Sequence, residues 1–388
     1  MNCGSLRTSA LNAAYANGTL CHALDFDNTW FPANHPTSPA LPAILALAER
    51  EHATGRDVLL ATVLAFEVQG RMRLATRAVG ANSTFHKPGV SGLMGAVTGA
   101  GKILGLDAPQ FCNAFGVGGS RAGSITVNTG TMTKSSHAGH GARMGVETAL
   151  LARRGWTAVD DVFGAGRFFD TFYGAGVYEP DLFLPGFGQP YRMVTPGVGF
   201  KKYPANYYTH RPIDAALELR SKHGIVAAEI EHLEIDFPDF PHIIRARPMT
   251  GLDGKFSVQY ATAVAFLDGK VTTESFSEAR RFAPDAVALL DRVRVNVRKE
   301  IPRDIADTYA VVRVMTKDGR MLEERCDVPR GFPGLPLTRD ERLAKFHDCV
   351  AARLAPAARD RLVGLIENLD DCKDIAELMT IAGCAGPA

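Results

Sequence analysis

Apolar residues recur at helical spacing over most of the first half of the chain and again near its end. Residues three and four positions apart share one face of a helix, so this spacing predicts α-helices rather than strands. The expected helices cover residues 5–23, 39–52, 58–76, 91–104, 108–117 and 137–154, and then 338–354, 356–368 and 374–382. Both parts of the chain are therefore predicted to be entirely helical.

A different pattern fills residues 200–335, where apolar and polar residues alternate. The alternating apolar positions are Leu233, Ile235 and Phe237, then Val293, Val295 and Val297, then a stretch at 309–316. A period of two is typical of half-buried strands, and Asp318-Gly319 is a strong hairpin-turn signal. With helices expected at about 211–222 and 258–268, this part is predicted to be a small α+β domain.

The change in periodicity gives the expected domain organisation. Residues 1–199 and 336–388 are predicted to form one large all-α helical domain, and residues 200–335 a smaller α+β lid domain. The fold class is therefore predicted to be mainly α.

Composition excludes several classes of partner. Lysine plus arginine (43) nearly balances aspartate plus glutamate (42), so no global field attracts nucleic acid or an anionic membrane. The seven cysteines are scattered, without a Cys-x-x-Cys pair, which favours neither a disulfide framework nor a zinc site. No signal segment and no run of eighteen apolar residues is present, so we expect a soluble, cytoplasmic protein.

Potentially catalytic side chains are densest between His22 and Ala40. This stretch holds His22, Asp25, Asp27, Asn28, Thr29, Trp30 and His35. Ser38 is expected to cap the next helix, with Pro39 at its first position. His35 precedes a proline, which favours an extended backbone just before that helix and suits the imidazole to act as an acid or base.

A second polar segment, residues 118–136, is rich in Gly, Ser and Thr and is expected to be a loop that leads into a helix. Lys134 lies near its end. Free backbone N–H groups and a lysine at a helix N-terminus suit a carboxylate, although a capped helix with a solvated lysine explains the same residues.

Four ordered motifs carry a family resemblance. They are Ala-Leu-Asp-Phe-Asp-Asn-Thr-Trp followed by His-Pro (23–36), Phe-His-Lys-Pro-Gly-Val-Ser-Gly (85–92), Thr-Lys-Ser-Ser-His-Ala-Gly (133–139) and Phe-Lys-Lys-Tyr-Pro-Ala-Asn-Tyr-Tyr-Thr-His-Arg-Pro (200–212). Together they resemble the MmgE/PrpD family, which includes 2-methylcitrate dehydratase, cis-aconitate decarboxylase and iminodisuccinate epimerase. The resemblance implies that the α+β segment is an insertion, that the protein is a homodimer, and that the chain starts after helices that usually precede this region.

The resemblance also implies a set of site residues. Transferred by motif, the catalytic residues are His35, Asp25, Thr29 and Lys201, and the substrate-binding residues are His86, Lys134, His210 and Tyr260. Lys201 is preferred to Lys202 because the family lysine lies three residues before the proline, here Pro204. His35 would carry the proton, the lysines and His86 would bind carboxylates, and Asp25 and Thr29 would orient His35 or the substrate.

The implied function is a lyase or isomerase that transfers a proton next to a carboxylate of a short di- or tricarboxylic acid, with neither a metal nor an organic cofactor. Decarboxylation of cis-aconitate and dehydration of a 2-methylcitrate-like substrate fit best, with epimerisation as an alternative. Asn28 and Asn206 depart from the family pattern, and they bear on which substrate fits.

The sequence leaves three other classes of function open. Asp25-Phe26-Asp27-Asn28-Thr29 resembles the Asp-x-Asp-x-Thr motif of haloacid-dehalogenase-type phosphatases, although no downstream Gly-Asp-x-x-x-Asp motif exists. A metal hydrolase could use His22, Asp25, Asp27 and His35, but no His-x-x-x-His or His-Glu-x-x-His spacing is present. A shortened, inactive homologue with a binding or assembly role is the non-enzyme alternative.

Overall fold

The computed structural model describes residues 6–30, 32, 34–79 and 84–383. Their contacts divide them into two compact units. Unit 1 comprises the described residues of 1–23, 27–198 and 349–388, and unit 2 comprises residues 24–26 and 199–348. Among the helices of these described residues, none combines the length and the apolar character needed to cross a membrane.

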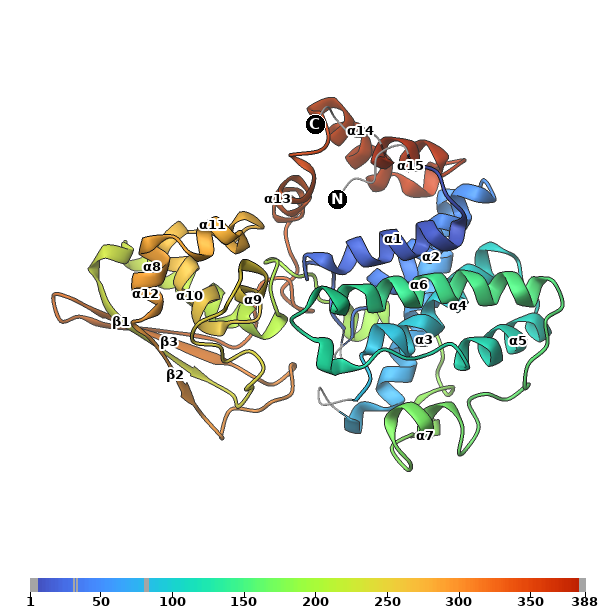
Figure 1. Ribbon diagram of the computed structural model, residues 1–388, viewed down its shortest axis with the longest axis horizontal. Helices are drawn as coiled ribbons and strands as arrows, with labels where there is room; N and C mark the ends of the chain where they lie inside the picture. Colours follow the sequence, from blue (N-terminus) through green and yellow to red (C-terminus); the bar gives the residue numbers. More distant parts are fainter. Residues whose placement is uncertain (1–5, 31, 33, 80–83, 384–388) are drawn as a thin grey trace. The chain divides into compact units, whose positions relative to one another are not determined.

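Unit 1 is built from α-helices joined by loops and short turns of 3-10 helix. Its helices are α1 (Ala10–Ala23), α2 (Thr37–Arg50), α3 (Gly55–Ala75), α4 (Ser91–Ile103), α5 (Ala108–Gly119), α6 (Met132–Arg153), α7 (Phe168–Tyr173), α14 (Pro356–Glu367) and α15 (Ala376–Gly383). Helix α4 is the centre of the unit, because α2, α3, α5 and α6 all pack against it (Figure 1).

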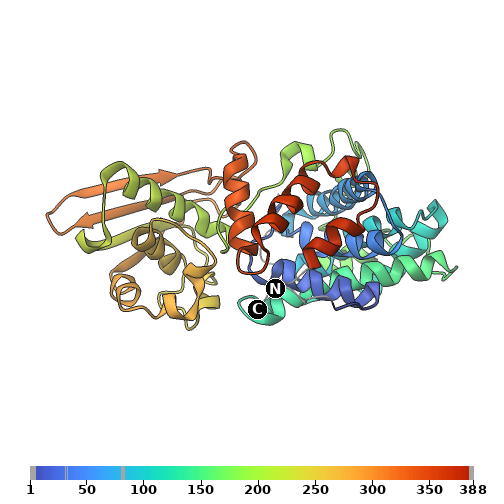
Figure 2. The same ribbon diagram turned by 90° about the horizontal axis from the view of Figure 1, so that it is seen from above.

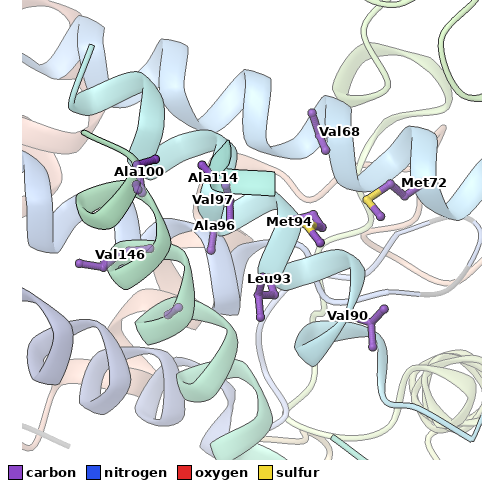
Figure 3. Close-up of a cluster of buried hydrophobic side chains, with 14 of the residues drawn as sticks. Val68, Met72, Val90, Leu93, Met94, Ala96, Val97, Ala100, Ala114 and Val146 are labelled. Carbon is purple, nitrogen blue, oxygen red and sulfur yellow. The ribbon is translucent and has the colours of Figure 1, made fainter. Parts of the chain in front are cut away.

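The core of unit 1 forms around α4, in which every residue from Ser91 to Gly101 is buried. Leu93, Met94 and Val97 project from this helix into a cluster with side chains of α3, α5 and α6 (Figure 3). Small residues let the backbones approach closely. A Cβ atom on Gly145 of α6 would lie 2.4 Å from the Cβ of Ala96 and 2.7 Å from its carbonyl carbon, so a side chain at this position cannot fit without a backbone shift.

Replacing Gly145 with alanine should therefore destabilise the protein although alanine favours helices. Overpacking of this kind typically costs about 1–3 kcal/mol. Gly364→Ala in α14 is the matched control, since no atom lies within 4 Å of the added Cβ, and it should be neutral or stabilising by up to about 1 kcal/mol. Urea unfolding of both variants measures the difference, and equal free energies of unfolding would contradict the close packing.

The C-terminal helices α14 and α15, drawn in red in Figure 2, belong to unit 1. Backbone hydrogen bonds attach this segment to the start of α3: Gly55 donates its N–H to Cys372 O, and Ile375 donates its N–H to Ala53 O. Gly55 lies so close to Leu369 that a Cβ would meet the carbonyl oxygen of Leu369 at 1.6 Å. Segments more than 300 residues apart in sequence thus form one unit.

Unit 2 combines a four-stranded sheet with short helices. Its elements are α8 (His210–His223), β1 (Ile230–Phe237), α9 (Gly251–Gly254), α10 (Val258–Asp268), α11 (Glu278–Arg281), α12 (Pro284–Leu290), β2 (Val293–Val297), β3 (Ala310–Thr316), β4 (Met321–Cys326) and most of α13 (Arg339–Val350). The strand order is β2-β1-β3-β4, with β1 parallel to β2 and antiparallel to β3. Helices α8 and α10 cover one face of the sheet (Figure 1).

The prediction of a mainly α protein is confirmed, and the four strands of the described residues all lie within residues 200–335. Leu233 and Ile235, two of the alternating apolar residues, are fully buried. The predicted hairpin is also present, because β3 and β4 pair in antiparallel register around Asp318 and Gly319, where Gly319 adopts a φ of +87°. Residues 336–348, which the periodicity assigned to the helical domain, lie in unit 2.

Several predicted helix starts were wrong by a few residues. Helix α2 begins at Thr37, with Pro36 rather than Ser38 at the cap position. Helix α3 begins after Thr54, whose hydroxyl accepts the Asp57 N–H, while the Asp57 carboxylate accepts the Thr54 N–H. The predicted start at residue 58 was therefore three residues late, and Asp57 is the third residue of the helix and completes a capping box.

Two further starts differ. Helix α1 begins at Ala10, whereas the prediction began at residue 5, which lies outside the described residues. Helix α6 begins at Met132, five residues before the predicted start, so Lys134 lies in its first turn rather than in a loop. The polar sequence of this first turn hid the helix, because only apolar residues at helical spacing produce the periodicity that predicts a helix.

Candidate active site

The histidine and aspartate side chains of the candidate site in unit 1 come from several different elements. His22 is in the last turn of α1, Asp27 is in the loop that follows, and His35 lies two residues before α2. His86 precedes a turn that leads into α4, and His137 is in α6. Helices α1 and α6 pack closely because both have glycines at the contact: a Cβ on Gly18 would lie 2.9 Å from the Cα of Gly139. This close packing brings His22 near the first turns of α6.

Asp27 is a buried carboxylate that contacts two imidazoles. Its Oδ2 lies 2.9 Å from Nδ1 of His22 and 3.3 Å from Nδ1 of His35. His35 Nδ1 is also 3.2 Å from the backbone oxygen of Asn28. The side chains of His22 and Asp27 have no solvent exposure, whereas that of His35 is 18% exposed. His35 is therefore the member of this trio that solutes can reach.

These contacts determine which nitrogen of His35 is available for chemistry. Both neighbours of its Nδ1, the Asp27 carboxylate and the Asn28 carbonyl, are hydrogen-bond acceptors, so Nδ1 must carry a proton. In the neutral ring the lone pair is then on Nε2. The arrangement thus presents Nε2 of His35 as a base, or as an acid once the ring is protonated.

The electrostatics keep Asp27 ionised. Burial alone would raise the pKa of this carboxyl, but the imidazoles of His22 and His35 outweigh burial and hold the pKa well below its usual range. For His22, burial dominates and lowers the pKa to about 4, although Asp27 opposes this shift. At neutral pH the pair is therefore a carboxylate and a neutral imidazole.

This pairing predicts a loss of stability in mild acid. The pKa of His22 is near 4 in the folded protein and near 6.5 in an unfolded chain, so only the unfolded chain takes up this proton between those values. Stability should therefore fall as pH drops from about 6.5 to 4, by on the order of 3 kcal/mol from this residue. His22→Gln should make the pH dependence of urea unfolding shallower, and an unchanged dependence would contradict the assignment.

His86 and His137 extend the cluster. Their Nδ1 atoms are 3.0 Å apart, and the ring of His86 is centred 5.8 Å from that of His22 and 6.1 Å from that of His35. Burial lowers the pKa of His86 well below its usual value, and the positive charge of Lys134 lowers it further. A neutral His86 can donate one hydrogen bond to an anion, while buried Lys134 supplies a positive charge in the same neighbourhood.

Unit 2 contains a second buried pair. Lys201 Nζ donates to the Asp25 carboxylate at 2.8 Å and to the Asp25 backbone oxygen at 2.7 Å, and both side chains are almost completely buried. Two further lysines bond to the neighbouring backbone: Lys255 Nζ lies 2.8 Å from Leu24 O, and Lys345 Nζ lies 2.6 Å from Phe26 O. Asp25 has a φ of +50°, which is rare for a residue other than glycine. Three ammonium groups thus hold residues 24–26 in one conformation.

The remaining predicted site residues, Thr29, His210 and Tyr260, are all buried. Thr29 is buried, and its hydroxyl donates to Asn34 O at 3.4 Å. His210 is fully buried, and burial together with Lys201 lowers its pKa well below the usual value. Tyr260 lies in the core of unit 2 and donates its hydroxyl to Ser275 O at 2.6 Å. These contacts are those of a core residue.

The structure also contradicts one alternative function and adds residues to which the family resemblance assigned no role. In haloacid-dehalogenase-type phosphatases the nucleophilic aspartate follows a strand, but Asp25 follows helix α1. Asp27, His22 and His137 were not among the predicted site residues. The high density of ionisable side chains between His22 and Ala40 was the only signal in the sequence for the first two.

Two family models and several known proteins match most of this chain. Residues 3–179 match the model of the MmgE/PrpD N-terminal domain, and residues 203–371 match that of the MmgE/PrpD C-terminal domain. The chain is 31% identical to cis-aconitate decarboxylase of Mus musculus over 94% of its length and 77% of the relative's. It is 30% identical to the enzyme of Homo sapiens (97% and 80%) and 26% identical to that of Aspergillus terreus (96% and 81%). This chain therefore belongs to the MmgE/PrpD family.

Proposed function

We propose that this protein is a lyase that works without a cofactor and transfers a proton at a carbon next to a carboxylate of a short di- or tricarboxylic acid. Decarboxylation of cis-aconitate is the first candidate reaction, because the relatives that cover most of the chain bear that name. Dehydration of a 2-methylcitrate-like acid is the second. The observation that carries the proposal is the pairing of ionised Asp27 with His35, which leaves Nε2 of a partly exposed imidazole available.

In a decarboxylation, the bond between carbon and the leaving carboxylate breaks and carbon dioxide departs. The electron pair moves into the unsaturated carboxylate system that remains, and protonated His35 gives its Nε2 proton to carbon. Asp27 keeps the Nδ1 proton in place and stabilises the ring while it is charged. Water then returns a proton to His35, so each turnover consumes one proton and releases one carbon dioxide.

The substrate carboxylates require positive partners. Lys134, buried in the first turn of α6, and His86 provide a cation and a neutral donor in unit 1. The family motif also assigns a catalytic role to Lys201, whose ammonium Asp25 holds within unit 2. A lysine beside a carboxylate also stabilises the negative charge that develops on it during proton transfer.

Lys134→Ala should mainly weaken substrate binding. A hydrogen bond to a charged group contributes about 1.5–3 kcal/mol, so KM should rise roughly tenfold to a hundredfold while kcat changes less. Lys102→Ala is a suitable control, because Lys102 is an exposed lysine in the last turn of α4. Steady-state kinetics on the active substrate give both constants, and an unchanged KM for Lys134→Ala would contradict the role.

Incubation with a panel of di- and tricarboxylates in deuterated water, followed by proton NMR, tests the proposed function. Decarboxylation of cis-aconitate predicts new exomethylene signals and one deuterium bound to carbon in each product molecule. Dehydration of 2-methylcitrate predicts an alkene without loss of carbon dioxide, and epimerisation predicts exchange of a proton next to a carboxylate. If no acid of the panel changes in the presence of a folded, monodisperse protein, the proposal is wrong and a binding or assembly role is favoured.

A further inference from the structure

The imidazoles of His22, His35 and His86 converge in unit 1. One nitrogen from each lies within 4.8 Å of the nitrogens of the other two. The three side chains come from the end of α1, the loop before α2 and the segment before α4, so tertiary packing rather than a sequence motif brings them together. This explains why no metal-binding spacing is visible in the sequence.

In all three rings, Nδ1 is already engaged by another group. Asp27 contacts Nδ1 of His22 and of His35, and His137 contacts Nδ1 of His86. The nitrogen that remains in each ring is Nε2. For His22, Nε2 is buried and has no hydrogen-bond partner among the residues that the structure describes. A buried nitrogen without a partner costs free energy, which a ligand at this position would recover.

This arrangement has the features of a transition-metal site. Histidine ligands of metals usually donate their second ring N–H to a carboxylate or another acceptor, which fixes the tautomer and the ring orientation. Three imidazole ligands leave one position of a tetrahedral ion open for water. Imidazole nitrogen suits zinc, cobalt, nickel and copper, whereas magnesium and calcium prefer oxygen.

We propose that His22, His35 and His86 bind one divalent transition-metal ion through their Nε2 atoms, and that this ion inhibits the enzyme reversibly. The binding site follows from the geometry of unit 1 alone, whereas the inhibition rests on the proposed function. A metal on Nε2 of His35 occupies the lone pair that would carry the proton. The ion is thus a competitor of catalysis and not a cofactor.

The neighbouring charges predict how the affinity responds to mutation. Asp27 places a negative charge behind two of the ligands, whereas Lys134 adds a positive charge that opposes a bound cation. Lys134→Met should therefore tighten metal binding, and His22→Ala or His86→Ala should weaken it at least tenfold. Exposed His52, which pairs with Asp374 at 2.8 Å, provides a control histidine outside the cluster.

The test uses the full chain without a histidine tag, titrated with zinc by calorimetry and with cobalt by its visible absorption. One equivalent should bind to the wild type and to His52→Ala, with weaker binding to His22→Ala and His86→Ala. Circular dichroism confirms folding, and His22→Gln replaces any alanine variant that does not fold. The inference would be overturned if the wild type lacked a one-equivalent site, or if the His22 and His86 variants bound the metal as tightly as the wild type.

Activity assays separate this inference from the proposed function. With an active substrate, zinc should abolish turnover, and a chelator should restore it fully. If the protein binds metal as predicted but converts no carboxylate, the proposed function fails while the metal site stands. If the protein is active but binds no metal, the metal site fails while the proposed function stands.

Discussion

His35→Ala is expected to lower kcat at least a hundredfold on the true substrate while leaving the fold intact. General acid–base catalysis by a positioned side chain contributes roughly a hundredfold to ten-thousandfold, and His35 is the partly exposed imidazole that Asp27 orients. Its side chain lies in a loop just before α2 and is 18% exposed, so its removal leaves no large cavity in the core. KM should change less than kcat.

Steady-state kinetics, together with the thermal unfolding midpoint, check this result. His52→Ala is the matched control, because His52 also contacts a carboxylate through Nδ1 but is exposed and lies outside the four motifs. This control should keep full activity. A His35→Ala enzyme with wild-type turnover would rule out the proposed mechanism even though the family membership stands.

Asp27→Asn is expected to have the second-largest effect on turnover, on the order of a hundredfold or more in kcat. An asparagine is neutral and can turn its NH₂ group toward the imidazoles, which would move the lone pair of His35 from Nε2 to Nδ1. The charge that stabilises protonated His35 would also be lost. Since Asp27 is buried behind the ring, KM should change little.

Asp374→Asn gives the matching control, because Asp374 makes the same contact with His52 at the surface. The pH dependence of kcat distinguishes a role in positioning from a general loss of stability. If Asp27 sets the protonation of His35, the pH profile should shift in Asp27→Asn and remain unchanged in Asp374→Asn. Loss of stability without any change in kcat or pH profile would show that Asp27 is only structural.

Periodicity predicted the helices and strands well, because burial of one face imposes that pattern directly. The strand around Leu233 and Ile235 and the hairpin at Gly319 followed from it. Helix ends depend instead on single hydrogen bonds, such as the one that the Asp57 N–H donates to the Thr54 hydroxyl. Other residues within one turn could make a similar bond, so the sequence alone does not determine where the helix begins. The first turn of α6 was predicted to be a loop because its polar sequence shows no apolar periodicity.

Only the motifs indicated a candidate site in detail. The resemblance implied His35, His86 and Lys134 as site residues, and the structure places all three in unit 1. The link between Asp27 and the rings of His22 and His35 depends on how α1 ends and how α1 packs on α6, which no motif encodes. For Tyr260 the resemblance implied a substrate-binding role, whereas the structure shows a side chain that packs in the core of unit 2.

The most direct test of the central claim is the isotopic content of the product formed by the wild-type enzyme in deuterated water. In the decarboxylation, proton transfer by His35 to a carbon next to a carboxylate predicts one solvent deuterium bound to carbon for every product molecule. Mass spectrometry and proton NMR of the same sample measure the deuterium and its position. A decarboxylated product without deuterium on that carbon, or no turnover of any di- or tricarboxylate, would contradict the account.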